Sequence, residues 1–422
     1  MAHPPQNPGW IFRVHSRASC GARTALLAAM CVIAGTPLAQ AQTFSSVYSF
    51  QGKTDGRNPQ LGVFTDAIYG TTFLGGDTTC GCGTIFKLAT TGTLKTLHTF
   101  VGTDGANPTP GLVGDKNANL FGTTSQGGVG SASAGTVFKL APPGTVGGAW
   151  TETVLHTFTG GADGAHPYAG VILDTAGNLY GTTNAGGAFN YGTVFKLDAA
   201  GNETVLYSFT GSLDGAYPYA GVVRDSAGNL YGTTNAGGAF SHGTVYKVDA
   251  SHRETVLHSF NGGTDGAYPS AGLTLDAAGN LYGTANEGGG AGDEGTIFEI
   301  TSAGSFTVLH TLTGNAGGAN PATGMILNSA GKLYGTTTEG GDGDDDGIAF
   351  ELDPATSTFT VLHTFTSGSG GTYPYTGLIL DSAGNLYGAT VSGGTGMGRG
   401  LAYKIIPWAG GGVLQDRRST NF

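Results

Sequence analysis

A phrase of the form Asp-Gly-x-x-Pro recurs along the chain, and several copies carry tyrosines beside the proline. Carboxylates can hold a metal ion or sugar hydroxyls, and flat aromatic rings can stack on sugar rings. The alternative is structural, because an Asp before Gly accepts hydrogen bonds inside its own turn while Pro stiffens the following chain. Repetition of one Asp favours the structural interpretation and argues against catalysis, which needs different groups at one place. The aspartates concerned are Asp55, Asp104, Asp163, Asp214 and Asp265.

The copies of this phrase that are richest in tyrosine give the candidate ligand-binding site. Aromatic side chains there could stack on a ligand, while carboxylate and phenol groups bond its rim. They could also simply cover the proline-stiffened turns, and the sequence leaves both interpretations open. The candidate residues are Asp163, Tyr168, Asp214, Tyr217, Tyr219, Asp265 and Tyr268.

An acidic run at residues 342–347, Asp-Gly-Asp-Asp-Asp-Gly, matches the start of a calcium-binding loop. Asp353 falls at the twelfth position of such a loop, but residues 348–352 match a strand of other copies and would carry it away. A calcium site would therefore use Asp342, Asp344 and Asp346 with backbone carbonyls and water. The alternative is an acidic, solvated hairpin tip. We expect no other cofactor.

Cysteines and histidines complete the candidate chemistry. Cys80 and Cys82 are the cysteines beyond residue 41, and we expect them to form a disulfide that staples a loop across Gly81. One histidine per copy is spread around a ring and cannot meet the others at one metal ion. We therefore expect packed or half-exposed histidines on outer strands. They are His98, His156, His258, His310 and His363.

Composition limits the fold that positions these groups. Of 422 residues, 78 are Gly and 16 are Pro, and only 11% are charged. So much Gly excludes a coiled coil or helical bundle, and the 17 Tyr and 21 Phe are unlike a disordered chain. The composition predicts an all-β protein with short strands and tight turns.

A repeat of about 52 residues covers most of the chain. The phrase Asn-Leu-Tyr-Gly-Thr-Thr recurs seven times with small changes, and a period near 50 made of strands favours propeller blades. The third copy holds four strand-like segments at 170–173, 178–183, 192–197 and 203–209, joined as hairpins. The aromatic residues of the phrase are Tyr69, Phe121, Tyr180, Tyr231, Tyr282, Tyr334 and Tyr387.

The two ends of the repeat region predict ring closure. Residues 44–50 match a fourth strand, while the last copy ends after its third strand at 401–405. Pairing of the two would complete the last blade and remove the open sheet edges. We therefore predict a seven-bladed β-propeller of four-stranded antiparallel blades, closed by the N-terminal strand.

The fourth copy reads Gly-Asn-Leu-Tyr-Gly-Thr-Thr at 228–234 and Gly-Thr-Val-Tyr-Lys-Val at 243–248. These phrases resemble the GloVer tandem repeat of secreted bacterial proteins described as choice-of-anchor, and the resemblance covers residues 44–406. It implies export and, in many members, a C-terminal surface-sorting segment. It implies no established catalytic activity and transfers no catalytic residue. Residues 407–422 depart from the pattern, because they lack an apolar helix followed by a basic tail.

Three domains follow from these patterns. Arg13, Arg17 and Arg23 precede an apolar run at 25–35 and an Ala-Gln-Ala site at 39–41, which is typical of a secretory signal. We predict a signal peptide at 1–41, the propeller at 42–406 and a disordered tail at 407–422. No later segment is apolar enough to cross a membrane, and the formal net charge of −11 disfavours nucleic acid.

Consecutive strands place two kinds of loop on opposite faces. The loops from strand four to the next strand one, and from strand two to strand three, form what we call the loop face. The short Asp-x-Ala-Gly-Asn turns form the turn face. Tyr373 and Tyr375 also fall on the loop face. Variable loops on a rigid scaffold commonly bind ligands.

We therefore expect a secreted, monomeric, non-catalytic recognition scaffold that binds a glycan or an extracellular protein on the loop face. The alternative is an extracellular carbohydrate-active enzyme, a lyase or hydrolase of propeller type. Such an enzyme needs a pair of acids, or an acid with His and Arg, in the channel.

Overall fold

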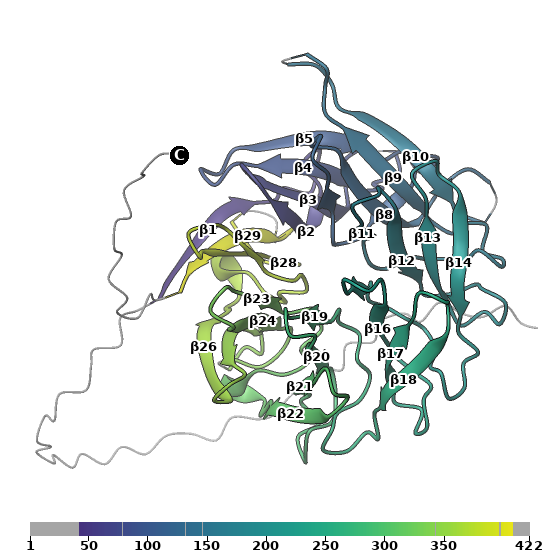
Figure 1. Ribbon diagram of the computed structural model, residues 1–422. Coiled ribbons are helices and arrows are strands. Elements are labelled where there is room, and N and C mark those ends of the chain that lie inside the picture. The colour runs from purple at the N-terminus through teal and green to yellow at the C-terminus, as the bar shows by residue number, and fades with distance from the viewer. Residues whose placement is uncertain are drawn as a thin grey trace, which may run out of the picture. The chain divides into compact units, whose positions relative to one another are not determined.

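The computed structural model describes residues 42–407 except residues 78, 131, 146, 342, 396 and 397. Seven antiparallel sheets stand around a central axis as the blades of a propeller (Figure 1). The predicted signal peptide and the tail from 408 onward lie outside the described residues. Among the described residues, no helix has the length and hydrophobicity that a membrane crossing requires.

Each blade runs from an innermost to an outermost strand in chain order, except that β1 closes blade 7. The strands are, for blade 1, β2 (Arg57–Phe64), β3 (Ile68–Leu74), β4 (Thr84–Leu88) and β5 (Leu94–Thr99); for blade 2, β6 (Ala106–Pro108), β7 (Val113–Gly114), β8 (Leu120–Gln126), β9 (Thr136–Ala141) and β10 (Thr151–Thr157); for blade 3, β11 (Ile172–Leu173), β12 (Leu179–Thr183), β13 (Thr193–Leu197) and β14 (Glu203–Ser208); for blade 4, β15 (Val223–Arg224), β16 (Leu230–Thr234), β17 (Thr244–Val248) and β18 (Glu254–Ser259); for blade 5, β19 (Thr274–Leu275), β20 (Leu281–Ala285), β21 (Thr296–Ile300) and β22 (Phe306–Thr311); for blade 6, β23 (Ile326–Leu327), β24 (Leu333–Thr337), β25 (Ile348–Asp353) and β26 (Thr358–Thr364); and for blade 7, β27 (Ile379–Leu380), β28 (Leu386–Thr390), β29 (Leu401–Ile406) and β1 (Thr43–Ser49). Two short 3-10 helices, η1 (Asn315–Gly317) and η2 (Gly368–Gly370), lie in the loops before β23 and β27.

The predicted ring closure is confirmed. Strand β1 pairs antiparallel with β29, from Thr43 opposite Ile406 to Ser49 opposite Leu401. In Figure 1 the purple β1 and the yellow β29 lie side by side in blade 7. The last blade therefore has its outer strand from the opposite end of the chain.

The innermost strand of blade 3 is shorter than the sequence predicts. In blade 3 a strand is predicted at 170–173, but β11 holds only Ile172 and Leu173. The reason lies in the adjoining blade, because the Gly170 N–H donates to the Pro110 carbonyl at 2.7 Å instead of bonding inside its own sheet. The start of the inner strand is therefore used to join blades.

Aromatic pairs form much of the core between blades. A buried Phe just after strand four meets a buried aromatic residue on strand three of the next blade, as Phe158 meets Phe195 with ring centroids 5.2 Å apart. Such edge-to-face pairs add roughly 0.5–1.5 kcal/mol beyond the area they bury. The pairs are Phe50–Phe86, Phe100–Phe138, Phe158–Phe195, Phe209–Tyr246, Phe260–Phe298 and Phe365–Tyr403.

A second ring of contacts joins the blades at the loop face. In every blade the residue before the recurring Pro has a positive φ, between 53° and 58°. Its N–H donates to a carbonyl of the preceding blade, at 2.7–3.1 Å. The Pro itself packs on the Gly after that carbonyl, where a Cβ on Gly192 would lie 2.7 Å from Cδ of Pro218. This arrangement explains why the Gly and the Pro recur together.

Candidate functional site

The ring of backbone hydrogen bonds at the loop face places two residues next to each other at each junction between blades. We call these the junction pairs. The backbone geometry is the same at all seven, whereas the side chains differ in size, charge and aromatic character. The pairs, acceptor first, are Arg399–Asn58, Cys82–Asn107, Ala134–His166, Tyr191–Tyr217, His242–Tyr268, Glu294–Asn320 and Asp346–Tyr373.

The junction pairs of blades 3, 4 and 5 are aromatic. The rings of Tyr191 and Tyr217 lie 5.5 Å apart, edge to face, and those of His242 and Tyr268 lie 5.4 Å apart. Tyr217 keeps 37% of its surface exposed. These blades therefore present aromatic surface on the loop face.

Two further tyrosines stack at the start of the innermost strands. Tyr168 and Tyr219 have ring centroids 5.5 Å apart and planes only 16° from parallel. Burial raises the pKa of both phenols, and the nearby Tyr168 and Tyr217 add to this for Tyr219. Both phenols are therefore protonated donors at neutral pH. Because the innermost strands line the axis of a propeller, this stack lies at the loop-face end of the channel.

Tyr375 of blade 7 lies near Tyr219, although the sequence analysis left it out of the candidate site. It occupies the same place after Pro374 as Tyr168 and Tyr219 do in their copies. Burial raises its pKa first, and the nearby Tyr219 contributes as well. Residues of blades 4 and 7 can only come close across the axis, so Tyr375 faces the channel mouth. Its place after the Pro was the signal in the sequence.

The aspartates of the candidate site are engaged inside their own loops. Asp163 accepts from the backbone N and the Oγ1 of Thr159, at 2.9 and 2.5 Å. Asp214 accepts from the Tyr207 phenol at 2.9 Å. Asp265 bonds Nε2 of His258 at 3.0 Å and also accepts from the Asn261 N–H. These contacts fix the loops to the outer strands, which supports the turn-capping interpretation for the carboxylates.

The acidic loop of blade 6 has diverging side chains. Asp344 is exposed, whereas Asp346 is buried and accepts from Oγ of Ser367 at 2.8 Å. Burial raises the pKa of Asp346, and Asp344 and Asp345 add to the shift. Asp342 lies outside the described residues, so the calcium site stays a prediction.

The disulfide expected between Cys80 and Cys82 is present in the structure, with the two Cα atoms 5.2 Å apart. Oδ1 of Asp77 accepts from the N–H groups of Thr79, Cys80 and Gly81. These bonds, the one from Cys80 first, hold the pKa of Asp77 below its usual range. The disulfide and the hydrogen bonds to the Asp77 carboxylate therefore both hold this loop of blade 1 in its conformation.

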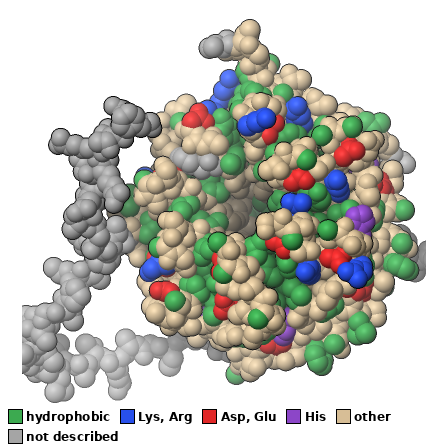
Figure 2. Space-filling view, in the orientation of Figure 1, with side chains coloured by type: hydrophobic (Ala, Val, Ile, Leu, Met, Phe, Trp, Pro, Cys, Tyr) green, Lys and Arg blue, Asp and Glu red, His purple; other side chains and the backbone are tan. Residues whose placement is uncertain are grey.

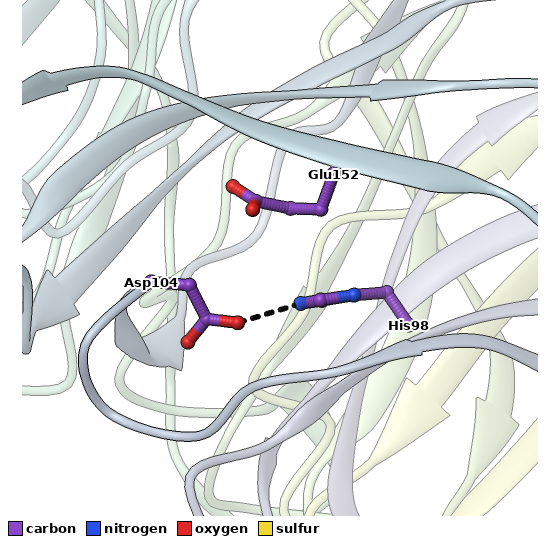
Figure 3. Close-up of side chains that lie close together, drawn as sticks. All are labelled: His98, Asp104 and Glu152. Carbon is purple, nitrogen blue, oxygen red and sulfur yellow. Dashed lines mark hydrogen bonds and ion pairs between the residues drawn. The ribbon is translucent and has the colours of Figure 1, made fainter.

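The outer-strand histidines have partners that the sequence analysis missed. Nε2 of His98 lies 3.0 Å from Oδ2 of Asp104, and the Glu152 carboxylate of blade 2 lies beside both (Figure 3). Burial raises the pKa of Glu152 to about 7, with Asp104 adding to the shift and His98 opposing it. The missed signal was the Glu on strand four, where blades 5, 6 and 7 carry Phe.

The turn face has a different character. A cavity of about 780 Å³ opens where the inner strands of blades 3 to 6 end, and aliphatic side chains such as Ile172, Val223 and Leu327 line it. Arg224 also lines it, with its guanidinium 5.5 Å from the centre of the Tyr180 ring. The face in Figure 2 carries basic side chains near acidic ones around a central opening with apolar side chains.

Solved structures with the same fold come from proteins of different activities. One is the extracellular domain of a putative one-component system from B. thetaiotaomicron (11% identity, TM-score 0.52, covering 86% of this chain and 40% of that one). Another is an oligogalacturonate lyase from Vibrio parahaemolyticus (11% identity, TM-score 0.52, covering 87% and 97%). A third is a puromycin hydrolase (12% identity, TM-score 0.53, covering 80% and 50%). At such identities the likeness shows the fold alone.

No curated protein sequence is similar enough to count as a relative of this chain. A family model does match, over residues 36–244 and again over 212–403, and its description is the Gloeobacter/Verrucomicrobia repeat. The two matches together span nearly the whole propeller, and they agree with the resemblance found in the recurring phrases. The chain belongs to the Gloeobacter/Verrucomicrobia repeat family.

Proposed function

We propose that this protein is an exported, non-catalytic recognition scaffold that binds a glycan at the loop-face end of its channel. The observation that carries the proposal is the stack of Tyr168 on Tyr219, with Tyr375 of blade 7 near enough to Tyr219 to interact with it electrostatically. Flat aromatic faces suit sugar rings, and protonated phenols at the edge can donate hydrogen bonds to sugar oxygens.

Backbone conformation at the junction pairs supports a role for the side chains. Asn tolerates a positive φ well, and Asn58, Asn107 and Asn320 occupy this position in three blades. Tyr217 and Tyr268 adopt the same conformation, which is unfavourable for a bulky residue by roughly 1–3 kcal/mol. A tyrosine that replaces the better-suited Asn is more easily understood if its ring contacts a ligand.

Charge on the loop face favours a neutral glycan over an acidic one. Among the seven junction pairs Arg399 is the one Lys or Arg, whereas Glu294 and Asp346 are acidic. Burial and nearby carboxylates raise the pKa of both Glu294 and Asp346, which indicates that negative charge is crowded there. An anionic sugar would meet repulsion on that side.

Non-catalytic binding is supported by the state of the loop carboxylates. Asp163, Asp214 and Asp265 each accept hydrogen bonds from their own loop or outer strand. A glycosidase or lyase needs acids free to approach the substrate. Tyr168 and Tyr375, in contrast, keep 38% and 46% of their surface exposed.

The test is a glycan array screened with the purified exported chain, followed by affinity measurements on each hit. Tyr168→Ser with Tyr219→Ser uses the residue that blade 5 carries at this place, Ser270. We expect this variant to lose at least about tenfold in affinity while its melting temperature stays the same. Unchanged affinity in a folded variant, or capture of proteins but no glycan, overturns the proposal. Turnover of a bound glycan overturns its non-catalytic part.

Export is proposed from the arginines, apolar run and Ala-Gln-Ala site of residues 1–41. N-terminal sequencing of material recovered outside the cytoplasm is expected to begin at Gln42. A first residue before position 30 would contradict this part of the proposal.

A further inference from the structure

Three side chains that can bind metal ions converge where blades 1 and 2 meet. His98 lies on β5, Asp104 follows it in the loop to blade 2, and Glu152 lies on β10 (Figure 3). One donor atom of each lies within 4.8 Å of the other two. All three groups are partly buried, so the cluster is neither deep in the core nor a free surface patch.

The hydrogen bonds around this cluster leave ligand atoms available. Oδ1 of Asp104 accepts the Val101 N–H at 2.9 Å, which turns Oδ2 toward Nε2 of His98. Oε1 of Glu152 is buried and has no hydrogen-bond partner among the described residues. A buried carboxylate oxygen without a partner is unfavourable, and a bound cation would remove that penalty.

The other blade junctions act as natural controls within the same chain. Between blades 4 and 5, His258 and Asp265 keep the 3.0 Å contact, but Phe306 replaces the Glu and stacks on His258 at 3.7 Å. Between blades 5 and 6, His310 stacks on Phe359 in the same way. Packing at this position is therefore satisfied by Phe, and Glu152 adds a third ligand instead.

The junction between blades 2 and 3 repeats the residue types but has a looser geometry. His156 lies 3.4 Å from Asp163, and Nε2 of His156 and Oε1 of Glu203 are both without a hydrogen-bond partner among the described residues. Within the part of the chain that the structure describes, the group that brings three donor atoms within 4.8 Å of one another is the one between blades 1 and 2.

We propose that His98, Asp104 and Glu152 form a binding site for a divalent transition-metal ion such as Zn²⁺. One imidazole nitrogen and two carboxylate oxygens suit zinc, and their two negative charges balance the ion. Water is the fourth ligand, because the site is partly open. Calcium is disfavoured, since it takes six to eight oxygen ligands.

Such a site links two blades near their outer edge. His98 and Asp104 come from the end of blade 1 and the connection that follows, while Glu152 comes from the outer strand of blade 2. An ion held by both binds the folded chain and not the unfolded one, and therefore stabilises the fold by linkage.

The experiment titrates the purified chain with Zn²⁺ by calorimetry and with Co²⁺ by visible absorption, and measures melting with and without Zn²⁺. We expect one equivalent to bind, tetrahedral Co²⁺ bands to appear, and the melting temperature to rise. Glu152→Phe restores the packing of blades 5 and 6, so it should keep the metal-free melting temperature and weaken binding more than about tenfold. His98→Gln should weaken binding likewise.

Glu203→Gln at the neighbouring junction is the matched control and should leave metal affinity unchanged. Even a weak site would bind Zn²⁺ at a concentration of about 0.1 mM. The assignment is therefore overturned if the wild-type chain binds no Zn²⁺ at that concentration. It is also overturned if Glu152→Phe and His98→Gln both bind normally, or if Glu203→Gln removes the binding.

Discussion

The two faces of this propeller are built from the same repeat but treat their side chains in opposite ways. On the turn face both backbone and side chains repeat, as where Asp174 accepts from Ala176, Asn178 and Tyr180. On the loop face the backbone repeats while the side chains vary from Arg399 to Tyr191. The variation of side chains between blades therefore distinguishes the turn face, which is structural, from the loop face, which can bind a ligand.

Electrostatics point the same way. Burial alone would raise the pKa of Asp174, but hydrogen bonds from Asn178 and Tyr180 outweigh it and hold that pKa below its usual range. Asp225 and Asp381 behave alike. The polar groups of the turn face thus form hydrogen bonds with one another. On the loop face, Tyr168 and Tyr375 keep 38% and 46% of their surface exposed.

The largest loss of stability is expected at a position where the repeated backbone of the loop face leaves no room for a side chain. Gly192 has φ +96°, and a Cβ there would lie 2.4 Å from the Thr183 carbonyl oxygen and 2.7 Å from Pro218. Gly192→Ala should lower the free energy of unfolding by more than about 3 kcal/mol. Urea unfolding measures this, and Gly304→Ala, with a positive φ but no neighbour within 4 Å, is the control. Equal losses for both would show that the close contact is unimportant.

A smaller loss is expected on the turn face. Asp174→Ala removes the acceptor of four hydrogen bonds from Ala176, Asn178 and Tyr180. The free energy of unfolding should fall by about 1–3 kcal/mol, whereas glycan binding should not change. Chemical denaturation measures the free energy of unfolding, and an affinity measurement with a glycan identified on the array measures binding. If the variant is stable but no longer binds the glycan, recognition lies on the turn face and the account is contradicted.

Tyr217→Asn exchanges a loop-face side chain for the residue that suits its backbone. Stability should stay the same or rise by up to about 1 kcal/mol, because Asn tolerates φ 58° better than Tyr does. Affinity for the glycan should fall, as measured by calorimetry. A clear loss of stability instead would mean that Tyr217 packs against Tyr191 chiefly to hold the fold.

The smallest effect concerns pH. Burial raises the pKa of Glu203 and Glu254 to about 7, with Asp163 and Asp214 adding to it. Since these values exceed the unfolded value of about 4.3, the native state keeps protons that the unfolded state releases. The stabilising contribution of the two glutamates is fully present below the unfolded pKa of about 4.3, and it is lost as pH rises through the folded pKa of about 7.

Glu203→Gln with Glu254→Gln should therefore gain stability relative to wild type as pH rises from about 4.3 to 7. Taking the difference between the two proteins at each pH cancels the opposite trend of His363, whose pKa burial lowers to about 4. A difference that stays constant across this range would contradict the raised pKa values.

The sequence was sufficient for the fold because the fold is periodic. Repeated phrases located every blade, and the unmatched strands at the two ends implied the pairing of β1 with β29. The shortened inner strand of blade 3 could not be foreseen, because the bond from Gly170 to Pro110 depends on how close neighbouring blades approach.

The site was predicted only in part, for a related reason. The tyrosines that follow the Pro were visible, but nearness of Tyr375 to Tyr219 requires the ring to be closed first. The histidines were correctly expected not to meet one another. Their contact with Asp104 and Glu152 arises between adjacent blades, which no spacing along one repeat reveals.

Hydrogen exchange with and without the array hit tests the central claim most directly, because it compares the two faces in one experiment. The account predicts slower exchange on glycan binding in the loops at 165–170, 216–221 and 372–377. The turns at 174–178 and 225–229 should be unaffected. Slower exchange confined to those turns and to the inner strand ends that line the 780 Å³ cavity would contradict it.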